Sequence, residues 1–291
     1  MHYGVYVPTS GDYDVRTVSE LAASAERAGW DGFFIWDNLL ATFDGSGILA
    51  DTTVTLAGIA LATRRLRFGP LVTPVARRRP WKLAKEMVTL DQLSGGRLIL
   101  GVGLGGEWDF QLVGEGEMSA ARARVMDETL EVISLLWSGE EVGHRGDHFT
   151  LLSPRMRPCP VQLPRIPVWT GGYWPGGGPF RRAARWDGVA PLRAGHWFQE
   201  LTPSELHECV TYIQRFRSES GPFDVVQFRT SPGATIDLVR EYEAAGATWW
   251  LEAAVPMNES LAAFRARVEA GPPAGRDLAP VNTAKNSRKI P

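Results

Sequence analysis

Short apolar segments and amphipathic segments alternate along this chain, and this alternation restricts its fold more than any other feature. Eight apolar segments, each bounded by turn residues, are predicted as β-strands at 4–7, 32–36, 66–73, 98–102, 167–170, 188–192, 223–230 and 248–255. Helical periodicity predicts helices at 15–28, 51–63, 80–93, 119–137, 180–186, 202–216, 235–245 and 260–270. Eight strands, each followed by a helix, predict a (β/α)8 barrel.

The main alternative for such a pattern is a doubly wound open sheet. Its first turn normally carries a glycine fingerprint for a dinucleotide, whereas residues 8–12 contain one glycine, Gly11. Residues 138–165 are irregular and rich in proline, and 144–149 are predicted to form a small hairpin, so this part is an insertion after the fourth strand. We expect one barrel domain over residues 1–271 and a tail at 272–291 that is disordered or lies on the surface.

Composition narrows the class of protein. The formal net charge of −2 argues against a nucleic acid or an anionic membrane as partner. Two cysteines, Cys159 and Cys209, lie far apart without the spacing of metal ligands, which is typical of a reducing cytoplasm and predicts no metal site. The amino terminus lacks the pattern of a signal peptide, and no apolar run approaches ~18 residues. The sequence therefore predicts a cytoplasmic protein.

Two glycine-rich strand ends mark a candidate site, because the carboxyl ends of barrel strands build the active site. The fourth strand ends in the glycines of 101–106 and leads directly to Glu107, so a flat ligand could approach bare backbone there. The fifth strand ends at 170–172, and the arginines at 181–182 follow, a combination that suits a phosphate group. By themselves, both segments are also compatible with ordinary turns.

Carboxylates at three strand ends allow a second interpretation. Asp37, Glu107 and Glu252 could serve a glycosidase-like barrel, in which a pair of carboxylates cleaves a glycosidic bond. Asp37 could equally cap the next segment, and Glu252 could be a buried carboxylate paired with an arginine. Aromatic residues near the strand ends predict a largely apolar substrate wall. This wall would be made of Tyr6, Trp36, Trp108 and Trp174.

Several stretches, taken together and in order, resemble the bacterial luciferase-like family of flavin- and deazaflavin-dependent oxidoreductases over about residues 3–272. The resemblance implies a TIM barrel with an insertion after strand four, a homodimer, and reduced FMN or coenzyme F420 at the strand ends. It also implies a small organic substrate and a separate flavin reductase as a further partner. The stretches are 28–32 leading to Trp36-Asp37, 72–74, 93–97 running into 101–103, 136–139, 166–172, 184–188 and 245–250.

The resemblance also implies roles for single residues. The family's strand-two cofactor contacts fall on Asp37 and Asn38, and its bend in the third strand, often through a cis peptide, falls on Pro70 and Leu71. The loop beside the ring corresponds to Gly105, Gly106 and Glu107, and the segment that holds the phosphate or tail corresponds to Thr170, Gly171 and Gly172.

Asn38 departs from the family pattern, in which many members have histidine. Asparagine forms hydrogen bonds but does not titrate near neutral pH. We therefore expect Asn38 to orient the ring and Glu107 to be the nearest candidate for proton transfer. The expected function is hydride transfer or monooxygenation, and a non-catalytic flavin-binding barrel is the alternative that the missing histidine leaves open.

Overall fold

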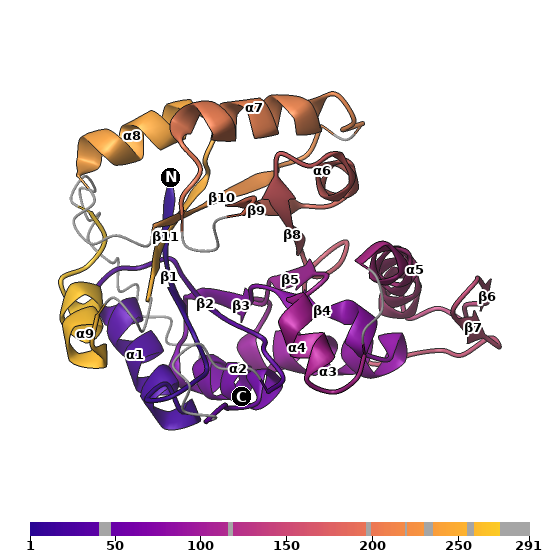
Figure 1. The fold of residues 1–291 in the computed structure, drawn as a ribbon. Coiled ribbons are helices and arrows are strands. Elements are labelled where there is room, and N and C mark those ends of the chain that lie inside the picture. Colours follow the sequence, from indigo (N-terminus) through magenta and orange to yellow (C-terminus); the bar gives the residue numbers. More distant parts are fainter. Residues whose placement is uncertain are drawn as a thin grey trace, which may run out of the picture.

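A parallel sheet closed into a barrel forms the centre of the protein, with helices around it (Figure 1). The computed structural model describes residues 1–40, 48–115, 119–195, 199–218, 220–229, 235–254 and 259–273. Within them, nine strand segments follow the order β3-β2-β1-β11-β10-β9-β8-β5-β4. They are β1 (His2–Val7), β2 (Gly32–Ile35), β3 (Arg67–Pro70), β4 (Thr73–Pro74), β5 (Leu100–Gly103), β8 (Val168–Trp174), β9 (Gly188–Arg193), β10 (Asp224–Arg229) and β11 (Trp249–Ala253).

The two ends of this order meet, which closes the barrel. Phe68 of β3 forms a parallel bridge with Leu98, just before β5, and the Ile99 N–H donates to the Phe68 carbonyl oxygen at 2.8 Å. Because β3 and β4 are two pieces of the third strand, the nine segments fill eight positions. The predicted (β/α)8 barrel is confirmed.

The sequence predicts one continuous third strand over 66–73, but the structure shows two separate pieces, β3 and β4. It breaks at Leu71 and Val72, whose peptide bond is cis, so the bend falls one residue beyond the predicted Pro70 and Leu71. The first piece pairs with β2 and the second with β5. Between the two pieces, the Leu71 N–H still donates to the Ile35 carbonyl oxygen of β2 at 2.7 Å, and Leu71 and Val72 both lie at the barrel mouth.

The helices cover the outside of the barrel, and seven of the eight predicted ones begin within one residue of the predicted start, whereas α6 (Gly177–Ala183) begins three residues before the predicted 180–186. Asp51 and Ser260 cap α2 and α9, and Thr202 opens α7 with a capping box. The short α4 (Glu107–Gln111) and η1 (Val75–Arg77) were not predicted. The longer helices are α1 (Val15–Arg27), α2 (Thr52–Ala62), α3 (Pro80–Ser94), α5 (Ser119–Trp137), α6 (Gly177–Ala183), α7 (Pro203–Gln214), α8 (Ile236–Ala244) and α9 (Leu261–Glu269).

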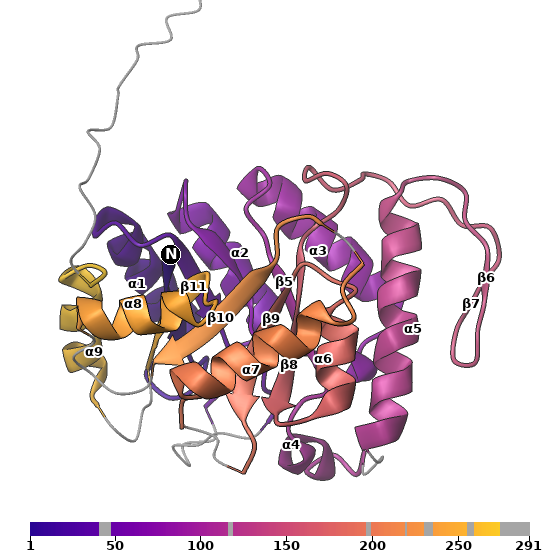
Figure 2. The same cartoon turned by 90° about the horizontal axis from the view of Figure 1, so that it is seen from above.

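The predicted hairpin is present as β6 (His144–Arg145) and β7 (Thr150–Leu151), which pair antiparallel. It projects beyond α5, away from the barrel, in both views (Figure 1, Figure 2). Glu128 of α5 fixes it by accepting hydrogen bonds from the His148 and Phe149 N–H groups at 2.8 and 2.7 Å and contacting His144 at 3.1 Å.

Aromatic side chains fill the barrel below the mouth. The rings of Phe34, Trp169 and Trp249 lie 5.1 to 5.7 Å apart, and all three side chains are buried. Both indoles donate to the Asp224 carboxylate at 3.1 Å. Burial raises the pKa of Asp224, against the effect of these hydrogen bonds. Packed aromatic side chains therefore occupy the lower half of the barrel.

The structure leaves part of the sequence-based organisation untested. Of the predicted tail at 272–291, residues 274–291 lie outside the described residues. In the part of the chain that the structure describes, no helix is long and apolar enough to cross a membrane.

Candidate functional site

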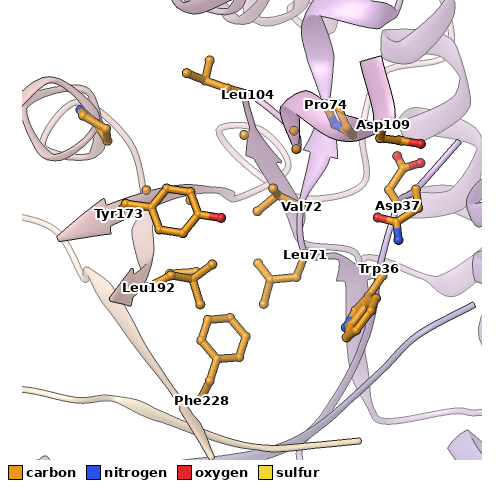
Figure 3. A pocket seen from close by; sticks show the side chains of 18 of the residues that line it. Trp36, Asp37, Leu71, Val72, Pro74, Leu104, Asp109, Tyr173, Leu192 and Phe228 are labelled. Carbon is orange, nitrogen blue, oxygen red and sulfur yellow. The ribbon is translucent and has the colours of Figure 1, made fainter. Parts of the chain in front are cut away.

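A cavity of about 530 Å³ opens at the carboxyl ends of the strands (Figure 3). Its size and its mostly apolar lining are typical of small-molecule and cofactor sites. The short helix α4 lies at this end of the barrel (Figure 2). Many residues predicted for the site share this cavity. They are Tyr6, Trp36, Asp37, Asn38, Leu71, Gly105, Gly106, Glu107, Trp108, Gly171 and Gly172.

Leu71 and Val72, the residues at the break in the third strand, form part of the cavity wall. Val72 lies between two glycines on neighbouring strands. A Cβ atom on Gly103 of β5 would lie 2.4 Å from Val72 Cγ2, and one on Gly171 of β8 would lie 3.0 Å from Cγ1. Real Cβ atoms do not approach as closely as 2.4 Å, so Val72 can occupy this place only beside a glycine at 103. A Cβ atom at 171 would require Val72 to shift by a few tenths of an ångström. The broken strand thus presents an apolar surface to the cavity.

Strand β8 differs from its prediction, which ended the strand at Thr170 and placed a turn at Gly171 and Gly172. The strand continues to Trp174, because its pairing with β9 extends to that residue. Alternation along the strand sends the side chains of Trp169 and Tyr173 inward and those of Thr170 and Trp174 outward. Gly171 and Gly172, which have no side chain, both line the cavity.

This alternation corrects two expected positions, because Thr170 and Trp174 are not among the cavity-lining residues. A third expected residue, Pro70 of β3, is paired with Ile35 of β2 and does not line the cavity either. The Trp174 ring packs instead against Phe180 and Tyr212, with ring centres 5.2 and 5.8 Å away, because it points toward the helices. Tyr173, which the sequence did not single out, takes its place in the wall.

Asp37 is buried at the rim and forms an ion pair with Arg78. The Arg78 Nη2 lies 2.9 and 3.1 Å from the two carboxylate oxygens. Burial raises the pKa of the Asp37 carboxyl, against the opposing effects of Arg78 and of the Thr73 and Thr52 hydroxyls. Asp37 therefore has its counter-charge within the protein itself.

Asp109 of α4 joins three loops of the cavity mouth. Its carboxylate accepts hydrogen bonds from the Leu39 and Leu40 N–H groups at 2.9 and 3.0 Å and from Arg77 at 2.9 Å. The side chain is almost fully buried. Asp109 thereby fixes the loop that carries Asp37 and Asn38. No local sequence pattern indicates these partners of Asp109, because they lie 32 to 70 residues away in the sequence.

The three carboxylates of the glycosidase interpretation are not brought together. Asp37 and Glu107 line the cavity, and Glu107 is exposed, whereas Glu252 is not a lining residue. Glu252 pairs with Arg267 of α9 and accepts a hydrogen bond from the Trp250 indole at 2.9 Å. This matches the alternative reading of Glu252 as a buried structural carboxylate.

Two arginines, Arg122 of α5 and Arg182 of α6, also line the cavity. Arg182 is held by Asp127, to which its Nε and Nη2 donate at 2.7 and 2.9 Å. Arg122 is buried and lies over the Phe110 ring at 4.5 Å. Arg181, predicted together with Arg182, contacts the Tyr212 hydroxyl instead. Across the described residues, no group of acidic, histidine or cysteine side chains could hold a metal ion.

The family model described as "Luciferase-like monooxygenase" matches residues 1–185, well over half of the chain. The chain belongs to this family. A relative is the uncharacterised protein Rv0940c of Mycobacterium tuberculosis, 31% identical over 249 residues, with 78% of this chain and 81% of that protein covered. An F420-dependent glucose-6-phosphate dehydrogenase of Amycolatopsis mediterranei is 29% identical over 170 residues, 57% of this chain and 51% of that protein.

Solved structures share the luciferase-like barrel. The coenzyme F420-dependent tetrahydromethanopterin reductase of Methanopyrus kandleri superposes with a TM-score of 0.72 at 18% identity, covering 92% of this chain and 96% of that chain. The oxygenating constituent of 3,6-diketocamphane monooxygenase of Pseudomonas putida, in complex with FMN, gives 0.64 at 17% identity and covers 79% and 68%. At these identities the likeness concerns the fold.

Proposed function

We propose that this luciferase-like protein is an oxidoreductase that binds reduced F420 or reduced FMN in the cavity at the barrel mouth. The bound ring would supply the hydride, or with FMN the oxygen activation, for reaction with a small organic substrate. The observation that carries the proposal is the apolar surface of Leu71 and Val72, made possible by the glycines at 103 and 171. Such a surface suits the face of a flat tricyclic ring.

Polar groups around this surface suit the rest of either cofactor. Arg122 and Arg182 are cations in the same cavity, and charge-assisted hydrogen bonds from arginine are well matched to phosphate. Gly105 has a φ of +74°, and a Cβ atom there would lie 2.8 Å from Phe110 and Pro74, so the loop beside the ring depends on glycine. Thr170 and Pro70 do not line the cavity, so they would affect cofactor binding only by positioning the neighbouring residues of their strands.

The chain's own residues would orient the ring and exclude water. Asn38 lines the cavity beside Asp37 and would donate or accept a hydrogen bond without changing charge. Glu107, in the first turn of α4, lines the cavity and is exposed, so its carboxylate would be within reach of a bound ligand. The aromatic side chains of Tyr6, Trp36 and Trp108 would cover the ligand.

The relatives support both cofactors. The Amycolatopsis dehydrogenase is named for F420, and the Pseudomonas monooxygenase binds FMN. If the cofactor is FMN, a separate flavin reductase would deliver it reduced, and by family resemblance the protein would work as a homodimer in the cytoplasm. A non-catalytic flavin-binding barrel is the second candidate, because Asn38 stands where many family members have a titrating histidine.

Anaerobic titration of the protein with reduced F420 and with reduced FMN tests the proposal. Trp36 and Trp108 line the cavity, so binding should quench tryptophan fluorescence with a saturable dependence on one of the two cofactors. Replacing Arg122 with Gln should weaken that binding about tenfold, since a hydrogen bond to a charged group contributes ~1.5–3 kcal/mol. Failure of both cofactors to bind would contradict the proposal.

Turnover distinguishes the two candidates. If the protein is an enzyme, the bound reduced ring should be oxidised by oxygen or by an added carbonyl compound faster than the free cofactor is. If the ring binds but is oxidised no faster, the non-catalytic barrel is the better description.

A further inference from the structure

A second hollow lies outside the barrel, between helix α3 and residues 150–156, where the chain returns from the hairpin β6–β7. Its volume is about 510 Å³, which is within the range of small-molecule sites. Its lining and that of the cavity at the barrel mouth have no residue in common. We call this hollow the outer groove. Its walls include the apolar side chains of Trp81, Leu136, Leu152 and Met156 and the cations Lys85 and Arg155.

Contacts at both ends of the outer groove hold the returning chain beside α3. At one end, the Trp81 ring packs edge-on against Phe149 of the hairpin, with 6.2 Å between the ring centres. At the other end, the Gln92 side-chain amide donates to the Cys159 carbonyl oxygen at 3.2 Å. The two segments therefore run side by side between fixed points, and the outer groove is a preformed feature of the fold.

The walls of the outer groove are mainly apolar. Leu136 of α5 is buried and Met156 is half-buried, whereas Trp81 is 44% and Leu152 83% exposed. A single exposed apolar side chain needs no explanation, but here two large ones lie at the same hollow. This surface suits the apolar body of a ligand.

Two cations from different elements share the outer groove, Lys85 from α3 and Arg155 from the chain after β7. Within the described part of the chain, neither side chain forms an ion pair, whereas the neighbouring Lys82 is paired with Glu86. Glu141 bridges Arg155 through the backbone of the hairpin but is not a lining residue, and the described lining contains no acidic side chain. The charge of the groove is therefore complementary to an anion.

We propose that the outer groove binds an amphipathic monocarboxylate, with its apolar body against Trp81 and Leu152 and its carboxylate between Lys85 and Arg155. The planar guanidinium of arginine matches the geometry of a carboxylate. A single negative charge suits this site, because a more highly charged group would lose more hydration beside the apolar walls. The site lies apart from the barrel mouth and does not depend on the proposed function.

Nuclear magnetic resonance of the tryptophan indole N–H groups tests this in the full chain. The probe is 4-phenylbutyrate, with 4-phenylbutanamide as the uncharged control of the same shape and acetate as the control without an apolar body. The Trp81 signal is identified by its absence from Trp81→Phe. We expect 4-phenylbutyrate to move this signal saturably, the amide to bind about tenfold more weakly, and acetate to leave the signal unchanged.

Four variants separate the charges from the apolar contact. Lys85→Ala and Arg155→Ala should each weaken binding of 4-phenylbutyrate about tenfold and leave binding of the amide nearly unchanged. Lys82→Ala is the matched control on the same helix, since Lys82 is paired with Glu86 outside the lining, and it should bind as the wild type does. Leu152→Ser should weaken binding of the acid and the amide alike.

Three results would overturn the inference. The first is a Trp81 signal that does not respond, or that responds equally to the acid and the amide. The second is a response confined to Trp36 and Trp108, which would place the carboxylate in the cavity at the barrel mouth. The third is a dimer in sedimentation equilibrium that Leu152→Glu converts into a monomer, because a second copy would then cover the outer groove. Cofactor titration is a separate measurement, so failure of the proposed function leaves this test unaffected.

Discussion

Asn38 stands at the position where the family resemblance implies a histidine. It lines the cavity beside Asp37, so its amide can contact a ligand. An amide cannot gain or lose a proton near neutral pH. Any role of Asn38 in the reaction must therefore be one of orientation.

Replacement of Asn38 tests that role. Asn38→Ala should lower the rate about tenfold through the loss of one hydrogen bond, without moving any pKa of the pH–rate profile. Asn38→His should add a titrating group near pH ~6.5. The measurement is kcat/KM against pH for the three proteins, and a shifted profile in Asn38→Ala would contradict a purely orienting role.

At the scale of elements, two adjacent glycines of β8 have different neighbours, one in the cavity wall and one in helix α6. Gly171 faces Val72, whereas a Cβ atom on Gly172 would lie 2.4 Å from Pro179 Cβ of α6. Gly171→Ala should displace Val72 and weaken cofactor binding about tenfold, while Gly172→Ala should lower the free energy of unfolding by about 1–3 kcal/mol through overpacking. Titration and thermal unfolding of both variants measure this, and a larger loss of affinity in the Gly172 variant would reverse the assignment.

The hairpin β6–β7 depends on the charge of Glu128. Burial alone would raise the pKa of Glu128, but hydrogen bonds from His144 and from the His148 and Phe149 N–H groups outweigh it and hold the pKa below its usual value. A carboxylate with a lowered folded-state pKa stabilises the fold above its unfolded pKa of 4.5, and this contribution is lost as the pH falls through the folded value.

Amide exchange measures this dependence. Once the pH falls below the folded pKa of Glu128, the N–H groups of His148 and Phe149 should exchange more than tenfold faster than the intrinsic pH effect accounts for, since each bond to the carboxylate contributes ~1.5–3 kcal/mol. Glu128→Gln should exchange faster at neutral pH and lose the extra pH dependence. If the exchange rates of wild type and Glu128→Gln differ by the same factor at acidic and at neutral pH, other contacts hold the hairpin.

The sequence predicted the elements well where the signals are local. Asp51 and Thr202 cap their helices through side chains three residues from the groups they bind, so composition alone reveals them. The extension of β8 depends on pairing of Gly172 and Tyr173 with Pro191 and Leu192 of another strand, which no local pattern shows. For that reason Tyr173 was missed and Trp174 was placed in the wall.

Non-local contacts also account for the rest of the site that was not predicted. The third strand breaks because its two halves pair with different neighbours, and Asp109 binds backbone groups of Leu39 and Leu40 about 70 residues away in the sequence. The glycines and Asp37 could be predicted because the family resemblance marks them. Their partners could not, since the resemblance does not specify which loops meet.

At the scale of the whole molecule, the barrel divides into a lower half filled by aromatic side chains and a mouth that holds the cavity of the proposed function. Asp224→Ala would leave the indole N–H groups of Trp169 and Trp249 without their acceptor. We expect it to lower the free energy of unfolding by about 2–4 kcal/mol and Asp224→Asn to cost less, because the amide oxygen still accepts. Denaturant unfolding measures the change in the free energy of unfolding. Weaker cofactor binding by a folded Asp224→Asn variant would show that the lower half also affects the cavity.

A crystal structure with the cofactor selected by titration tests the central claim most directly. We predict that the ring lies against Leu71 and Val72 at the barrel mouth, with its phosphate beside Arg122 and Arg182. A ring bound outside this cavity, or one whose phosphate lies away from both arginines, would contradict the account.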